Sequence, residues 1–248
     1  MTRHTVAGLL ALVCTAGLGA QAAGHRWIVD PRTSLVWWQV DPHYNHLWST
    51  TCPNDPSWQP GEGRDAGWQV NYKTRPVLRD AGVSDPRVPL FPRLAVHPVC
   101  RQAVHGEMVA GDDRWRGTHG TVVILADSFE TGLRLRNSFA SDHVIETSKY
   151  PSIEFTLDSL TNLQPGDTIR AIAVGTFSLH GVRTSQRVPV VAWREPTGLR
   201  VQGRFAMDAQ DLVNTYGMSR WALGLGVVMH RWKVVYLGLD LVVREAGS

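Results

Sequence analysis

The segment Gly175-Thr176-Phe177-Ser178-Leu179-His180-Gly181-Val182-Arg183-Thr184 carries the clearest structural signal in the chain. Large residues alternate with smaller or polar ones up to Leu179, and a His-Gly pair then interrupts the pattern. Alternation with a period of two is typical of a half-buried β-strand, and a short glycine-containing break between two such runs is typical of a hairpin. The segment therefore predicts two antiparallel strands joined by a tight turn.

The same alternation recurs along the chain on both sides of this hairpin. Strands are expected at 27–29, 34–40, 121–126, 153–158, 169–180, 186–194, 201–207 and 233–244. Short helical pieces are expected within 132–148 and at 209–214, and most other connections are turns. The pattern predicts an all-β fold with a single antiparallel barrel of about eight strands. A barrel of this size either fills with side chains or holds one small apolar ligand, and the sequence leaves both alternatives open.

Residues 1–23 have the pattern of a cleaved secretory signal peptide. A short polar start with Arg3 is followed by an apolar run of small residues and by Ala20-Gln21-Ala22, which fits an A-x-A cleavage site. The protein is therefore expected to be periplasmic or secreted. No later run approaches the ~18 apolar residues of a membrane-spanning helix, so no stable membrane span is expected.

The segment 41–120 interrupts the strand pattern. Nine of the 14 prolines fall in it, together with several Gly and Asp turn clusters. We interpret it as an irregular, Pro-rich insert within one barrel domain that spans 24–248. Short strands are expected near 67–72 and 103–109.

The insert also contains the two cysteines that remain after signal removal, Cys52 and Cys100. In an oxidising compartment an isolated pair favours a disulfide. The alternative is a metal site, because His43, His46 and His97 lie in the same insert as Cys100 and imidazole and thiolate are the usual zinc ligands. Their spacing matches no zinc module, so the sequence predicts a disulfide and neither a metal nor another cofactor.

Charge and motifs exclude several functional classes. The chain has 25 Lys+Arg against 22 Asp+Glu and no basic stripe, so nucleic acid is not an expected partner. A Gly-x-Ser-x-Gly elbow, a His-Glu-x-x-His motif and a phosphate-binding loop are all absent from the sequence. The sequence therefore predicts a binding protein and not an enzyme. A metal-binding module, or an adhesion or assembly module, that uses the His-, Cys- and Trp-rich insert remains the alternative.

Several motifs, taken together, resemble those of the YceI-like family of exported proteins. They are Trp27-x-Val29-Asp30 with Ser34 and Val36, Thr131-Gly132 with Arg136, Lys149-Tyr150-Pro151-x-Ile153-x-Phe155, Gly175-Thr176-Phe177-x-Leu179-His180-Gly181-Val182, and Tyr216-Gly217-Met218. The resemblance covers 27–40 and 121–243, whereas the insert exceeds the usual connection of this family. It implies a lipocalin-like barrel that sequesters a polyisoprenoid or isoprenoid-quinone lipid in a long apolar channel in the periplasm.

This resemblance and the alternation together define the expected binding residues. The channel-lining candidates are Phe155, Leu157, Phe177, Leu179, Phe205 and Tyr216. Arg136 and His180 are the candidates for contact with a polar head group. The expected partner is thus an apolar lipid, and a homodimer is compatible with the sequence.

Overall fold

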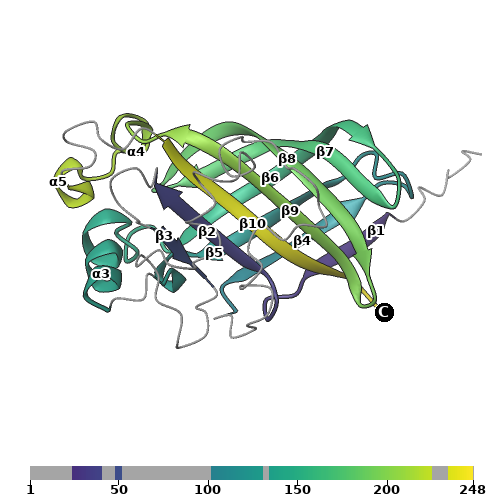
Figure 1. The fold of residues 1–248 in the computed structure, drawn as a ribbon, viewed down its shortest axis with the longest axis horizontal. Helices are drawn as coiled ribbons and strands as arrows, with labels where there is room; N and C mark the ends of the chain where they lie inside the picture. The colour runs from purple at the N-terminus through teal and green to yellow at the C-terminus, as the bar shows by residue number, and fades with distance from the viewer. Residues whose placement is uncertain (1–23, 41–47, 52–101, 131–133, 225–233, 248) are drawn as a thin grey trace, which may run out of the picture.

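The computed structural model describes residues 24–40, 48–51, 102–130, 134–224 and 234–247. The strands of this part of the chain form one antiparallel sheet in the order β1-β4-β5-β6-β7-β8-β9-β10-β2-β3, and a further pairing of β1 with β10 closes eight of them into a barrel (Figure 1). The strands are β1 (His25–Val29), β2 (Leu35–Val40), β3 (Trp48–Thr50), β4 (Val104–Ala110), β5 (His119–Leu125), β6 (Ser152–Gln164), β7 (Thr168–Leu179), β8 (Val182–Glu195), β9 (Gly198–Asp208) and β10 (Val234–Glu245). The predicted all-β barrel is confirmed.

The long strand β10 closes the barrel by pairing with two short strands along one edge. Its C-terminal part pairs with β1, from Trp27 opposite Glu245 to Val29 opposite Val243, and its N-terminal part pairs with β2. The break between β1 and β2 falls at Asp30-Pro31, as predicted. There the backbone amide of Ser34 donates to the carbonyl of Asp30 at 3.0 Å.

Part of the predicted insert belongs to the barrel. Strand β4 confirms the strand expected near 103–109, and it pairs with both β1 and β5. The three-residue strand β3 is a finding of the structure, held by β2 on one side and by reciprocal backbone hydrogen bonds between Thr50 and Glu130 on the other. The strand expected near 67–72, the pair Cys52–Cys100, the histidines at 43, 46 and 97, and the signal peptide lie outside the described residues.

The β7–β8 turn is as tight as its sequence predicted. His180 and Gly181 are the two central residues, with φ of 52° and 77°, between the paired residues Leu179 and Val182. Two successive positive φ values define the type I′ turn, which matches the twist of a hairpin. A Cβ at position 181 would lie 2.8 Å from the ring of Tyr150, so this position also requires glycine for close packing.

Short helices gather at one end of the barrel. Helix α3 (Arg134–Phe139) and the π-helix η3 (Ala140–Val144) follow the 3-10 turn η2 (Ala126–Ser128) and precede β6, while α4 (Asp211–Asn214) and α5 (Arg220–Leu223) connect β9 to β10. Helices α3, α4 and α5 all lie beyond the strands at the same end (Figure 1). The helical pieces expected within 132–148 and at 209–214 are confirmed, and α5 is an addition.

An ion pair joins two strands on the outer side of the barrel. The guanidinium of Arg200 donates from Nε and Nη2 to the two carboxylate oxygens of Asp240, each at 2.7 Å, and the amide of Gln202 donates to Asp240 Oδ2 at 2.9 Å. The Asp240 carboxylate raises the pKa of Arg200 above its ordinary value. Since Asp240 is only 3% exposed, this network is a buried tie between β9 and β10.

Candidate functional site

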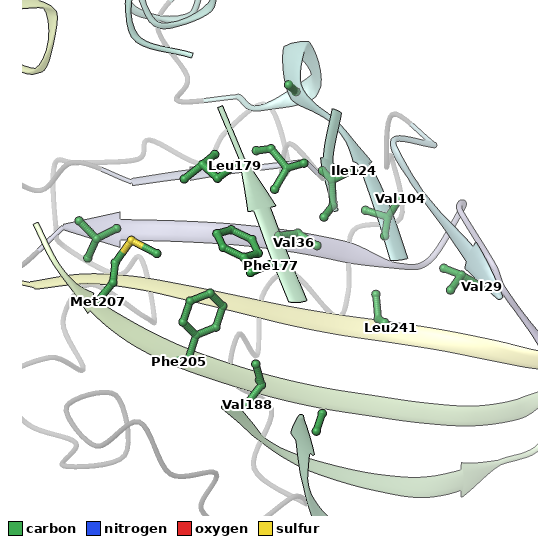
Figure 2. Close-up of a cluster of buried hydrophobic side chains, with 14 of the residues drawn as sticks. Val29, Val36, Val104, Ile124, Phe177, Leu179, Val188, Phe205, Met207 and Leu241 are labelled. Carbon is green, nitrogen blue, oxygen red and sulfur yellow. The ribbon is translucent and has the colours of Figure 1, made fainter. Parts of the chain in front are cut away.

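The half of the barrel interior near the helices contains a cavity of about 340 Å³, within the size range of small-molecule sites. We call it the main cavity. Strand residues that line it are Val36, Trp38, Val122, Ile124, Ile153, Phe155, Phe177, Leu179, Val188, Gly203, Phe205, Met207, Val235, Leu237 and Leu239. Figure 2 shows several of these side chains converging on the interior from different strands. Of the two alternatives that the sequence left open, the structure therefore shows a barrel whose interior is not filled by side chains.

Strand alternation explains why the walls are apolar. On β7 and β9 every second residue faces inward, which brings Phe177 and Phe205 together with ring centroids 5.3 Å apart in an edge-to-face contact (Figure 2). Gly203 is the inward position on β9 two residues before Phe205, and a Cβ there would lie 2.8 Å from a methyl group of Val190. The glycine therefore keeps this part of the wall thin.

A second, smaller cavity of about 100 Å³ lies toward β1 and the far ends of β7 to β10. Small inward residues such as Ala171, Ala173 and Ala192 line it, as the alternation along β7 and β8 dictates. Both cavities are lined by Val122, Phe155 and Leu239. These three side chains form the partition between them, and the aromatic ring of Phe155 is the largest.

The short helices lie over one end of the main cavity, and because the lining residue Phe139 is 47% exposed there, we call this end the mouth. Phe139, Ala140 and Val144 from α3 and η3 and Leu212, Met218, Ala222 and Leu223 from the β9–β10 connection line it there. Arg136 lines the same end, is partly exposed, and makes no ion pair with any residue that the structure describes. The other charged lining residue, Arg204, alternates with inward Gly203 and Phe205, so its side chain leaves from the outer face. Among the described residues, Arg136 is therefore the charged side chain that lines this end of the main cavity.

His180 holds the two helical covers together. Its Nδ1 lies 2.8 Å from the carbonyl oxygen of Tyr216, and its Nε2 lies 3.0 Å from Oε2 of Glu146. Both partners are acceptors, so both contacts are hydrogen bonds when each ring nitrogen carries a proton. Lys149, at 2.5 Å, and His180 together lower the pKa of Glu146. The imidazole also packs on Tyr150 with ring centroids 4.1 Å apart.

The predicted lining residues fall into three groups. Phe155, Phe177, Leu179 and Phe205 line the main cavity, whereas Leu157 lines the second one. Tyr216 lines neither, because its ring packs edge-on against Phe177 and its hydroxyl lies 2.8 Å from the hydroxyl of Thr184. Burial raises the pKa of this phenol, against the opposing effect of the hydrogen bond with Thr184.

Of the two head-group candidates, Arg136 reaches the main cavity and His180 does not. Sequence reasoning missed several lining residues. Val36 and Trp38 share one face of a predicted strand, and that parity would have identified them. Phe139, Met218 and Leu223 come from segments too short for their periodicity to define a face.

Within the described ranges, no group of three or more His, Cys, Asp and Glu side chains is placed to hold a metal ion. In the same part of the chain, no helix has the length and hydropathy to cross a bilayer.

The chain is similar in sequence to one protein family and in fold to several solved structures. The model of the YceI-like domain family matches residues 100–234. The crystal structure of BcnA from Burkholderia cenocepacia is 10% identical, with a TM-score of 0.55 over 86% of this chain and 98% of that chain. A polyisoprenoid binding domain from Saccharophagus degradans is 14% identical, with a TM-score of 0.49 over 88% and 98%, respectively. The Campylobacter jejuni YceI protein is 14% identical, with a TM-score of 0.44 over 58% and 82%. No curated protein matches the chain.

Proposed function

Because the chain belongs to the YceI-like domain family, whose model matches more than half of it, we propose that it sequesters one isoprenoid-type lipid and carries it without chemical change. The observation that carries the proposal is the main cavity, which is enclosed by apolar side chains and open at the end that holds Arg136. Among the described residues the wall holds no nucleophile, acid or base, and such an apolar cavity suits storage and transport.

The volume limits the length of the ligand. An engineered cavity of about 150 Å³ takes benzene, with six carbons, so 340 Å³ takes on the order of fourteen carbons. That is about three isoprene units, and the remainder of a longer chain would extend out of the mouth or into the second cavity. We therefore propose a short polyprenyl chain, or the inner part of a longer one, as the occupant.

The expected free energy of lipid binding leaves room for a polar contact at the mouth of the cavity. Burial of roughly fourteen carbons at about 0.8 kcal/mol each contributes about 11 kcal/mol. Association itself costs about 4–15 kcal/mol, so apolar burial alone gives modest affinity. A charge-assisted hydrogen bond at the open end adds roughly 1.5–3 kcal/mol. Arg136 is the proposed donor of that bond, to an anionic or strongly polar head group.

The signal-peptide pattern of residues 1–23 supports a periplasmic or secreted location for this carrier. In that aqueous compartment an isoprenoid chain needs a protein shell, and the barrel would supply it.

Native mass spectrometry of the protein purified from an exporting bacterium tests the proposal. We expect an adduct with the mass of an isoprenoid alcohol, phosphate or quinone, and rebinding of farnesol by the delipidated protein. Leu237→Trp fills the main cavity and should abolish both. Ile172→Trp makes the same type of change on the outward face of β7, next to inward Ala171 and Ala173, and should leave both intact. If the wild-type protein is purified without a lipid and also does not bind farnesol, the lipid-carrier proposal is wrong.

Arg136 has a separate test. Arg136→Gln should weaken binding of farnesyl monophosphate by roughly ten- to a hundredfold while changing farnesol binding little, since only the phosphate engages the charge. Equal weakening of both ligands would remove Arg136 from the head-group contact and leave the apolar cavity as the only determinant.

A further inference from the structure

Large apolar side chains are exposed at the end of the barrel where the main cavity opens. Leu135 on α3 is 88% exposed, Trp221 on α5 is 84% exposed and Phe139 on α3 is 47% exposed. Both helices lie beyond the strands at this end (Figure 1). Single exposed apolar residues are ordinary, but three of this size around a cavity mouth indicate an interaction surface. We call Leu135, Phe139 and Trp221 the mouth surface.

The mouth surface is continuous with the cavity wall. Phe139 is half-exposed and also lines the main cavity, and Ala222 and Leu223, the residues after Trp221, line it as well. Leu135 and Phe139 are four residues apart on α3 and so share one side of that helix. The apolar side chains at this end therefore extend from the outer surface into the main cavity.

Two cations accompany these side chains. Arg136 on α3 and Arg220 on α5 form no ion pair with any residue in the described part of the chain. The carboxylates on the neighbouring helices are Asp142 and Asp211, and the Asp211 carboxylate accepts a hydrogen bond from Thr215 at 3.2 Å. Exposed Trp, Leu and Phe beside Arg side chains that have no ion pair within the described residues is the composition of a surface that lies in the interfacial region of a bilayer.

We propose that the mouth surface docks the barrel on a lipid bilayer, with the main cavity opening toward the membrane. A bilayer fits better than a protein partner because the apolar surface leads directly into an apolar cavity, so a lipid can pass between them without crossing water. The unpaired arginines then meet phosphate head groups, whereas Trp221 and Leu135 insert below them. This docking rests on the proposed lipid cargo for its purpose, but its measurement does not require any cargo.

Vesicle flotation with the delipidated full-length protein tests the docking. Wild type should float with phosphatidylcholine vesicles and more strongly when phosphatidylglycerol is added. Leu135→Ser combined with Trp221→Ser should lower the partition coefficient roughly tenfold or more, because two inserting side chains are lost. Trp221→Ser alone should give an intermediate loss, and circular dichroism should show that the variants fold, since both side chains are exposed.

Ile28→Ser is the matched control, because Ile28 is 43% exposed on β1, which lies toward the other end of the barrel (Figure 1). It should float like wild type. Absence of flotation by wild type, or equal flotation by wild type and the double variant, would overturn membrane docking. A wild-type dimer in ultracentrifugation that the double variant abolishes, without any flotation, would assign the surface to a second copy instead. Farnesol binding by the non-floating variant would show that loss of docking is not loss of the carrier function.

Discussion

The Nδ1 atom of His180 lies 2.8 Å from the backbone carbonyl oxygen of Tyr216, across 36 residues of sequence. This contact joins the β7–β8 turn to the α4–α5 connection, while Nε2 of the same ring reaches Glu146 after η3. The β7–β8 turn and the two helical segments at the mouth of the cavity thus meet at one side chain that is only 7% exposed.

His180→Ala should therefore loosen both covers. It removes the His180 contact from the Tyr216 carbonyl and from Oε2 of Glu146, and the expected loss in unfolding free energy is about 1–3 kcal/mol. Hydrogen exchange should speed up at 140–150 and 211–219 more than in the barrel strands. Lys149→Ala removes the exposed partner of Glu146 and should change stability less than His180→Ala does, because solvent screens this pair. If hydrogen exchange instead becomes faster by the same factor over the whole sheet, His180 does not act locally on these two segments.

His25 should make stability depend on pH. Hydrogen bonds with Glu245, at 2.7 Å, and Asp113, at 2.9 Å, raise its pKa above 6.5. A raised pKa means that the folded state binds the proton more tightly, so the stabilisation is complete below pH 6.5 and is lost as pH rises through the raised value. The urea midpoint of wild type minus that of His25→Gln should be positive at pH 5.5 and shrink toward zero in mildly alkaline buffer. A difference that stays constant with pH would contradict this coupling.

The buried pair Arg200–Asp240 should be costly to break. Asp240→Ala leaves a guanidinium whose side chain is 19% exposed with only the 3.5 Å contact to Glu195, and the expected loss is about 3 kcal/mol, at the lower end for such pairs. Asp240→Asn keeps an acceptor oxygen and should cost less. Arg26→Ala breaks a pair whose side chains are 58% and 55% exposed, so it serves as the surface control and should cost less than about 1 kcal/mol. Urea unfolding compares the three, and equal losses for Asp240→Ala and Arg26→Ala would contradict the prediction.

Alternation with a period of two predicted the barrel, and the contrast between apolar inward and polar outward residues is clearest on β6 and β9. It could not predict β3, whose three residues are held by pairing with Trp37, Trp38 and Gln39 and by the bridge to Glu130 rather than by their own pattern. Helix α5 has four residues, fewer than a period can define. Position along the chain also concealed that β4 belongs to the sheet, since it follows the Pro-rich segment and one of its partners, β1, lies far away in sequence.

For the site, parity identified four wall residues of the main cavity but not their relation to one another. Phe155 and Leu157 share one face of β6, yet one lies at the partition and the other beyond it. Their depth depends on strand tilt, which the sequence does not encode locally. His180 contacts residues that are 34 and 36 positions away in the sequence. No local sequence pattern therefore distinguishes this structural role of His180 from contact with a ligand. That any of these residues touches a lipid remains a prediction.

The partition formed by Phe155, Val122 and Leu239 gives the final prediction, which concerns ligand length. Phe155→Ala removes the largest side chain between the cavities of about 340 and 100 Å³ and should join them. The added 100 Å³ corresponds to roughly four carbons on the scale of benzene in about 150 Å³, or nearly one isoprene unit, before the volume of the lost ring is counted. The variant should therefore prefer geranylgeraniol over farnesol, whereas wild type should not.

Competition between these two alcohols for the delipidated protein measures that preference. Phe129→Ala is the matched control, because Phe129 lines the main cavity but not the second one, so its removal widens the site without joining the two. Both variants should lose stability, by about 3 kcal/mol or less, since neither ring is fully buried. If Phe129→Ala shifts the preference as far as Phe155→Ala does, cavity volume and not the partition sets the length. If neither shifts it, the inner end of the chain does not reach Phe155.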